Sequence, residues 1–165
     1  TELCKCQALF TKFGGHRQAA GVSLKEENVQ RFRETINSLC TLTEEDLQMK
    51  VYIDMQVPFP YLTEDLIEQF QVMEPFGKGN KRPLFAEKDL KVIQPKIVGK
   101  NENVLQCILE DKQGNRMKAV YFGDVKTCLK EMLAGKVTAV TYFPSINEYM
   151  GRRSIQLTIV NYQKK

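Results

Sequence analysis

The stretch NVLQCILEDKQGNRMKAVYFG, residues 103–123, decides the fold that the sequence predicts. On either side of a short KQG segment, apolar residues alternate with polar ones: Leu105, Cys107 and Leu109, then Met117, Ala119 and Tyr121. A period of two is typical of a strand with one buried face, and a short connection with glycine favours a tight turn. The stretch therefore predicts a β-hairpin with these six side chains on its inward face.

Further strand patterns surround this hairpin. Residues 90–99 predict a long first strand before it, and Pro95 indicates an edge strand or a bulge there. Residues 136–144 and 153–162 predict two more strands, with a turn at 146–151 between them. In the last strand we expect Ile155, Leu157 and Ile159 to point inward.

Residues 124–135 instead have helical spacing. Their apolar face would carry Val125, Leu129, Met132 and Leu133, and Gly135 would end the helix. Three strands, a helix and two strands follow the order of the five-stranded OB-fold β-barrel. An unrelated five-stranded barrel or meander is the alternative, and the helix between the third and fourth strands weighs against it.

The first half of the chain mixes helices with short strands. We expect a helix over residues 2–12, a strand over 19–24, a helix with a buried stripe after a Ser23–Glu26 capping box, a strand over 49–57 and a helix after Thr63. The stripe would carry Val29, Phe32, Ile36 and Leu39, and the first helix would bury Leu3, Cys6, Leu9, Phe10 and Phe13.

A change in composition and charge predicts a domain boundary. The stretch MEPFGKGNKRPLF, residues 73–85, is rich in Pro and Gly, as linkers and structured turns are. Residues 1–76 hold seven Lys and Arg against twelve Asp and Glu, and residues 77–165 hold seventeen against eight, so −5 and +9 give the net +4. The predicted domains are therefore 1–76 and 77–165. A strongly basic half favours nucleic acid or an anionic surface as its partner.

Composition excludes several other classes. With 42% hydrophobic and 27% charged residues the chain fits a globular protein, and it has neither a membrane-span pattern nor a signal-peptide pattern. Five cysteines without a CxxC pair favour reduced thiols in the cytoplasm. Cys4 and Cys6 could be half a metal site, but the sequence offers no matching second half. The first residue is not Met, which we interpret as a piece of a larger protein.

The only histidine of the chain follows a double glycine in FGGHRQAAG, residues 13–21. Gly14 and Gly15 can adopt a positive φ and present backbone N–H groups to an anion. His16 adds a donor that can be charged near neutral pH, and Arg17 adds a fixed charge. This composition predicts a phosphate-binding loop, and a structural histidine on a turn is the alternative.

Three motifs together resemble a known family. KFGGHRQAAGVSL (12–24) resembles the GGH motif of the DHH-associated domain that follows the catalytic domain of DHH phosphoesterases. VYIDMQV (51–57), MEPFGKGNKRPLF (73–85) and NEYMGRRSIQLTI (147–159) are similar to the C-terminal region of the RecJ-like exonucleases of that family. The resemblance implies an α+β fold: the C-terminal part of an α/β DHH-associated domain, followed by an OB-fold domain.

The resemblance also implies an activity for the parent protein. RecJ-like exonucleases degrade single-stranded DNA from the 5′ end in DNA repair and recombination, with Mn²⁺ or Mg²⁺ held by aspartates and paired histidines. Their GGH loop holds substrate phosphate opposite the metals. This chain has one histidine and scattered aspartates, so we expect no catalytic residue, metal ligand or cofactor in it, and no nuclease activity from it alone.

The basic half supplies candidate contacts to single-stranded DNA. OB barrels bind phosphates with a basic groove and bases with aromatic rings. The candidates are Lys96, Lys100, Arg116, Lys118, Arg152 and Arg153 for the phosphates, and Phe122 and Tyr142 as the favoured rings among Tyr121, Phe122, Tyr142, Phe143 and Tyr149. Lys78, Lys81 and Arg82 could extend this track.

Two alternatives remain open. The OB module could serve mainly to dock partner proteins, such as a single-strand-binding protein or other repair proteins. The chain could also belong to a relative that acts on RNA or oligonucleotides. Counterion release on DNA binding would distinguish the first alternative by a steep salt dependence.

Overall fold

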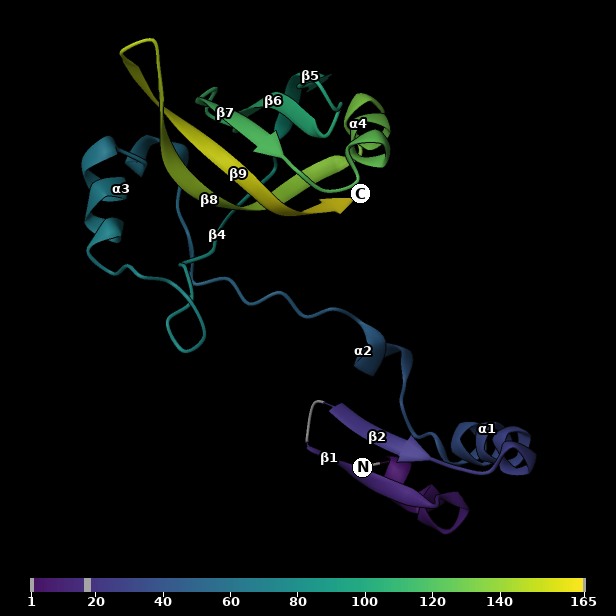
Figure 1. The fold of residues 1–165 in the computed structure, drawn as a ribbon. Helices are drawn as coiled ribbons and strands as arrows, with labels where there is room; N and C mark the ends of the chain where they lie inside the picture. Colours follow the sequence, from purple (N-terminus) through teal and green to yellow (C-terminus); the bar gives the residue numbers. More distant parts are fainter. Residues whose placement is uncertain (1, 17–18, 165) are drawn as a thin grey trace. The chain divides into compact units, whose positions relative to one another are not determined.

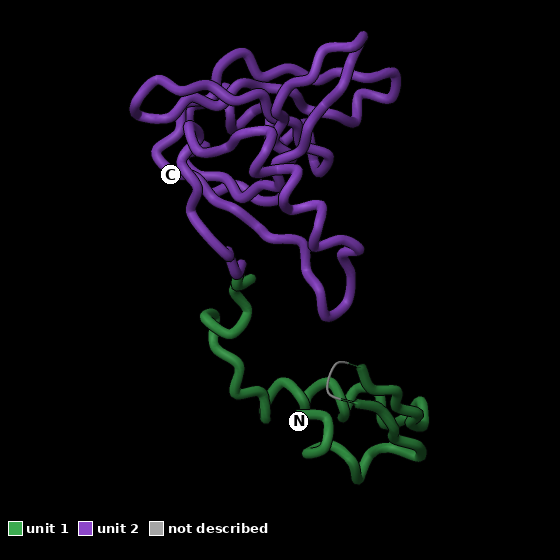
Figure 2. Tube along the Cα trace, turned by 90° about the vertical axis from the view of Figure 1, so that its left-hand side faces the viewer, with its two compact units in different colours: residues 1–50 green, residues 51–165 purple. Residues whose placement is uncertain are grey.

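The computed structural model describes residues 2–16 and 19–164. The chain divides into two compact units, residues 1–50 and residues 51–165 (Figure 2). Among the described residues, no helix has both the length and the apolar character needed to cross a membrane.

The first unit contains a two-stranded antiparallel sheet. β1 (Lys12–His16) pairs with β2 (Ala19–Ser23), and Gly14 lies opposite Gly21. The Phe10 ring lies 5.7 Å from the ring of Phe13 and 5.3 Å from that of Phe32, which joins the sheet to a helix. The helices of the unit are the 3₁₀ helices η1 (Glu2–Leu9) and η2 (Glu26–Asn28) and the α-helices α1 (Val29–Leu39) and α2 (Glu44–Leu47).

Several local predictions for this unit are wrong. The first helix is a 3₁₀ helix that ends at Leu9, and the double glycine lies in β1 instead of a loop because it pairs with β2. Ser23 lies in β2 and caps no helix. The capping box is at Thr43, whose N–H donates to Asp46 at 2.9 Å while its Oγ1 accepts from the Asp46 N–H at 3.3 Å. In the α1 stripe, Val29 is 44% exposed.

The second unit contains the predicted strand series. Within the order β8-β9-β7-β6-β5, which is that of an OB barrel, neighbouring strands are antiparallel except that β7 and β9 run parallel (Figure 1). α4 (Val125–Leu133) follows β7 and packs against β5 and β6. The strands are β4 (Phe85–Lys88), β5 (Lys91–Val98), β6 (Val104–Glu110), β7 (Arg116–Tyr121), β8 (Val137–Tyr149) and β9 (Arg152–Lys164).

A bend in the first strand closes the barrel. β4 pairs with β8, whereas β5 pairs with β6 at the other edge of the sheet. Two residues join β4 to β5: Asp89 has a φ of 58°, and the Leu90 N–H donates to the Thr138 carbonyl at 3.1 Å. The predicted first strand thus begins earlier, at Phe85, and contacts both neighbours. The irregularity expected at Pro95 is confirmed, because the register shifts between Ile93 and Lys96.

The core confirms most of the predicted inward residues. The hairpin and the last strand contribute residues that are almost fully buried: Leu105, Cys107, Leu109, Ala119, Leu157 and Ile159. In α4 the buried residues are Val125, Cys128 and Met132. Leu133, expected on that face, is 68% exposed, because the buried face follows Val125, Cys128 and Met132 and Leu133 lies outside it.

Residues 51–76 belong to the barrel unit. The boundary between the two units therefore lies between residues 50 and 51, and not after residue 76 as predicted. The predicted strand over 49–57 is reduced to β3 (Met55–Gln56), which pairs with β4. After it, Val57, Phe59 and Leu62 are buried in the barrel core. η3 (Phe59–Tyr61) and α3 (Glu64–Gln71) follow, and Thr63 caps α3 as predicted.

β8 and β9 form a longer hairpin than the sequence predicts. The expected turn over residues 146–151 is mostly strand, because β8 continues to Tyr149. The turn itself consists of Met150 and Gly151, whose φ angles are 50° and 72°. Two positive φ angles are characteristic of the tight type I′ turn that suits twisted hairpins.

The burial of Phe59 leads to a test of the revised boundary. Phe59→Ala should lower the free energy of unfolding of the second unit by about 3–5 kcal/mol, since it empties a core position. Tyr61→Ala, two residues away and 70% exposed, should change it by less than about 0.5 kcal/mol. All six tyrosines lie in residues 51–165, so tyrosine fluorescence in urea reports on this unit. If the two variants changed the free energy of unfolding equally, Phe59 would not be a core residue of the second unit, and residues 51–62 would not belong to that unit.

Candidate nucleic-acid interface

The strand register defines one outward surface of the barrel, which we call the outer face. Residues opposite one another on neighbouring strands point to the same side of a sheet, and side chains alternate along each strand. Lys96 lies opposite Gln106, Gln106 opposite Val120, Val120 opposite Thr158, and Thr158 opposite Phe143. A second row crosses the sheet beside the first: Ile93, Ile108, Lys118, Gln156 and Ser145.

Four of the predicted phosphate contacts share the outer face: Lys96, Arg116, Lys118 and Arg152. All four are exposed. The guanidinium of Arg116 is engaged, because its Nε lies 2.6 Å from Glu110 Oε2. Lys91, which lies opposite Glu110, also shares this face and was missed, although its alternation with the apolar Leu90 could have indicated it. The strand positions of this face therefore carry these five cations together with the carboxylate of Glu110.

Two other predicted contacts lie at one end of the outer face. Lys100 is exposed in the connection between β5 and β6. Phe122 directly follows β7 and is 60% exposed, so its ring is accessible. These positions remain compatible with the predicted roles in binding phosphates and bases.

Arg153 lies on the other side of the hairpin. It pairs with Glu148 in the register, whereas Arg152 pairs with Tyr149. Its guanidinium contacts two carboxylates of α3: Nε lies 3.3 Å from Glu64 Oε2, and Nη2 donates to Glu68 Oε1. The hydrogen bond to Glu68 and the charge of Glu64 raise the pKa of Arg153. Arg153 is thus bound to α3 and does not share a face with Arg152.

Tyr142 is not available as a stacking ring, so this prediction is corrected. The side chain is fully buried, packs against Phe59 and Phe85, and donates from Oη to the Val57 carbonyl at 3.0 Å. The cause is an irregularity early in β8, where the register shifts between Val137 and Ala139 and Thr138 is the extra residue. Each such bulge changes which alternate side chains face inward.

Phe143 takes the outward position instead. Its ring is half-buried on the outer face, and the guanidinium of Arg82 lies 5.0 Å from its centre. Arg82 also donates to the Pro144 carbonyl at 3.2 Å, which fixes it over the ring. The stacked pair presents a flat, cationic surface of the kind that binds nucleobases. Sequence alternation alone favoured Tyr142 over Phe143, and only the bulge reverses the choice.

The residues of the predicted phosphate loop lie in β1 of the first unit. Gly14, Gly15 and His16 are all exposed, and Arg17 lies outside the described residues. The φ of Gly15 is 159°, so it is extended backbone and not the turn geometry that we expected. Glycine is required at position 15 because the β2 backbone approaches it closely. A Cβ at this position would lie 2.5 Å from the Ala19 carbonyl oxygen and from Ala20 Cα.

The described side chains do not fit a metal centre. Within residues 2–16 and 19–164, no three His, Cys, Asp or Glu side chains gather in a group that could hold a metal ion. The exposed candidate His16 therefore has no neighbouring ligand set among these residues.

A family model described as "RecJ OB domain" matches residues 53–161. The chain belongs to the RecJ OB domain family. The match begins within a few residues of the boundary between the two compact units, so the family's extent and the fold agree on where the barrel unit starts. The resemblance to RecJ-like exonucleases drawn from the sequence motifs is thereby confirmed.

Relatives extend this likeness over most of the chain. The single-stranded-DNA-specific exonuclease RecJ of Haemophilus influenzae is 31% identical over 153 residues, which are 92% of this chain and 26% of that protein. The protein of the same name from Bacillus subtilis is 28% identical over 160 residues, 95% of this chain and 20% of the relative. This chain thus spans about a quarter or less of the length of these curated relatives.

Solved structures of RecJ from Thermus thermophilus share the fold. The structure with Mn²⁺ superposes with a TM-score of 0.71 at 20% identity, covering 99% of this chain and 23% of that one. The structure with Mg²⁺ gives 0.69 at 19% identity, covering 99% and 24%. These matches confirm the predicted α+β fold class with an OB barrel.

The contrast between the two glycines of β1 can be tested. Gly15→Ala should open the β1–β2 pair, because the new Cβ meets backbone atoms that cannot move independently. Gly14→Ala is the matched control, since nothing lies within 4 Å of a Cβ built there. Amide hydrogen exchange of residues 12–16 should accelerate in Gly15→Ala only. Unchanged protection in that variant would contradict the close approach.

Proposed function

We propose that the outer face binds single-stranded DNA. The observation that carries the proposal is the register of five strands, which gathers Lys91, Lys96, Arg116, Lys118 and Arg152 on one surface. Cations at this spacing suit the phosphates of an extended strand. The exposed rings of Phe122 and Tyr149, and the half-buried Phe143 with Arg82 over its ring, would supply platforms for bases on or beside the same surface. Membership of the RecJ OB domain family supports the choice of ligand.

For the whole protein we propose the activity that its relatives are named for. The chain would be the C-terminal, non-catalytic part of a 5′-to-3′ single-strand exonuclease that acts in DNA repair and recombination in the cytoplasm. Residues 1–50 would be part of a DHH-associated domain, with Gly14, Gly15, His16 and Arg17 positioning a substrate phosphate opposite a DHH metal site that binds Mn²⁺ or Mg²⁺. Residues 1–165 alone would bind single-stranded DNA without cleaving it.

A second candidate function is favoured by one observation. A mostly apolar groove of about 340 Å³ lies between residues 51–56, the start of β8 and the end of β9, and its lining includes Val51, Ile53 and Val140. Apolar grooves of this kind suit protein partners, so docking of a repair protein remains the alternative to strand binding. An RNA ligand is the other alternative for the outer face, because phosphates and stacked bases are common to both nucleic acids.

Salt dependence tests the proposed function. Loss of one phosphate contact should flatten the plot of log affinity against log salt by about 0.7, so Lys96→Ala with Lys118→Ala should flatten it by about 1.4. The effect should be the same for all sequences, because phosphates carry no base identity. Fluorescence anisotropy with single-stranded DNA, duplex DNA and RNA at several salt concentrations measures both quantities.

Lys126→Ala is the matched control for this test. Lys126 is an exposed lysine of α4, which is not part of the outer face, so its loss should leave the slope nearly unchanged. Equal slopes in the outer-face variant and wild type would move the binding site elsewhere. Tighter binding of RNA than of single-stranded DNA would favour the RNA alternative.

The role proposed for His16 is tested in the full-length protein. His16→Ala should lower turnover at least about a hundredfold, since a charge-assisted donor to a reacting phosphate is lost. Single-strand affinity should change little, because the outer face makes most of the phosphate contacts. Steady-state exonuclease assays and binding titrations measure the two effects. Normal turnover in this variant would make His16 a structural residue.

A further inference from the structure

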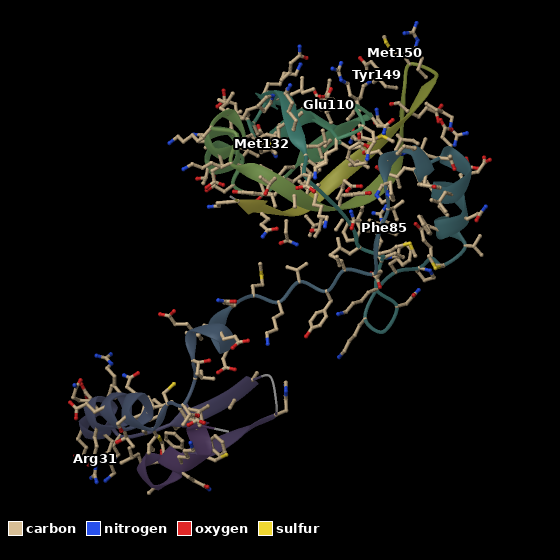
Figure 3. All side chains as sticks on the ribbon, turned by 180° about the vertical axis from the view of Figure 1, so that it is seen from behind. Arg31, Phe85, Glu110, Met132, Tyr149 and Met150 are labelled. Carbon is tan, nitrogen blue, oxygen red and sulfur yellow. The ribbon has the colours of Figure 1, made fainter. Side chains whose placement is uncertain are left out.

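The β8–β9 hairpin ends in a tip with unusually exposed side chains. Tyr149 is 69% exposed and Met150 is 86% exposed, and Figure 3 shows both at the far end of the hairpin. Tyr149 and Arg152 lie opposite each other, on the side of the hairpin that continues the outer face. Within the described part of the chain the acidic partners at this tip contact Arg153 and not Arg152. A phenol side chain and a guanidinium at paired positions on one side of the hairpin therefore offer a site for one base and its phosphate.

The other side of this hairpin is fixed to α3. Arg153 contacts Glu64 and Glu68, which lie one turn apart on that helix. α3 itself is anchored, because Ile67 is buried and the Phe70 ring lies 5.2 Å from the ring of Phe85 in the barrel core. α3 runs beside β8 and β9 in Figure 1, and packs against β8. The ion pairs therefore link the tip of a long hairpin to a helix that cannot easily move.

The placement of these two carboxylates needs a reason. All three side chains of the cluster are between 38% and 48% exposed, and ion pairs with such exposure contribute little to stability. Two carboxylates close to a surface that binds a polyanion also oppose binding by simple repulsion. The weak stabilisation and the repulsion are both offset if the ion pairs of Arg153 with Glu64 and Glu68 hold the hairpin in the orientation in which its tip contacts single-stranded DNA.

We propose that Glu64 and Glu68 are positioning residues for nucleic-acid binding: through Arg153 they brace the β8–β9 hairpin so that Tyr149 stacks on a base and Arg152 contacts the adjoining phosphate. This inference rests on the proposed function, since it extends the outer face by one base-binding position. It assigns Arg153 to the brace and Arg152 to the ligand. The two adjacent arginines thus have separate roles.

Whether neutralising Glu64 and Glu68 raises or lowers the affinity for single-stranded DNA distinguishes a brace from simple charge repulsion. Removal of two negative charges should tighten the binding of a polyanion if the carboxylates act only by repulsion. If they brace the hairpin, Glu64→Gln with Glu68→Gln should weaken single-strand affinity about three- to tenfold, approaching the roughly tenfold loss expected for Tyr149→Ala. Anisotropy titrations of residues 1–165 with a fluorescent thymidine oligonucleotide measure both.

Asp65→Asn is the matched control, because Asp65 is exposed on the same helix and contacts neither arginine. It should leave affinity unchanged or slightly raise it. Adding Glu68→Gln should cost less affinity in Tyr149→Ala than in the wild type, because one of the two contacts that the brace positions is already lost. Melting temperatures confirm that each variant is folded.

Unchanged or tighter binding by Glu64→Gln with Glu68→Gln would overturn the brace. If Lys118→Ala still weakens binding in that case, the outer face stands and only the inference fails. If wild-type protein binds no single-stranded DNA at all, the proposed function fails and the inference fails with it.

Discussion

The hydrogen bond from Tyr142 to the Val57 carbonyl is the contact on which the barrel unit depends. It exists because a bulge early in β8 turns Tyr142 inward, where its ring fills the core against Phe59 and Phe85. Burial, and then the nearby carboxylate of Glu87, raise the pKa of the Tyr142 phenol, so the group stays protonated and donates. The same bond holds residues that precede β4 in the sequence against β8.

This inward turn also determines the outer face. With Tyr142 inside, alternation along β8 places Phe143, Ser145, Asn147 and Tyr149 outside, in register with the polar and cationic side of β9. The opposite phase would place Phe143 in the core and Tyr142 outside. One irregularity therefore fixes both the anchoring of residues 51–62 and the set of aromatic rings available to a ligand.

Much of the fold could be predicted from local pattern, because β6 alternates cleanly, the central part of β9 buries Leu157 and Ile159, and α4 has helical spacing. The bulge in β8 could not, since Val137 to Tyr142 form an unbroken apolar-rich run whose phase depends on tertiary packing. The boundary was misplaced for a similar reason: Val57, Phe59 and Leu62 bury against strands far along the chain. Among the site residues, Lys96, Arg116 and Lys118 followed from alternation. The partners of Arg153 could not be inferred locally, because the nearer of the two, Glu68, is 85 residues away in the sequence and Glu64 is further still.

The revised boundary changes how charge is distributed. Residues 1–50 hold seven Lys and Arg against seven Asp and Glu, and residues 51–165 hold seventeen against thirteen, so the units carry 0 and +4. The basic character predicted for the second half is therefore a property of one surface and not of a whole unit. Glu64 and Glu68 of α3 lie on the side of the β8–β9 hairpin that faces away from the outer face, and Arg153 contacts both of them there. Because its basic and acidic side chains lie on different sides, a unit with a net charge of only +4 has a cationic outer face.

The most direct test of the outer face maps a ligand onto it residue by residue. Amide chemical shifts of ¹⁵N-labelled protein would be followed during titration with an oligonucleotide of about twelve thymidines, within the site size of one OB fold. The account predicts that the largest changes occur at Gln106, Lys118 and Gln156 on three adjacent strands, with little change in α4. Changes confined to the groove beside Val51 and Ile53, with none on these strands, would contradict it.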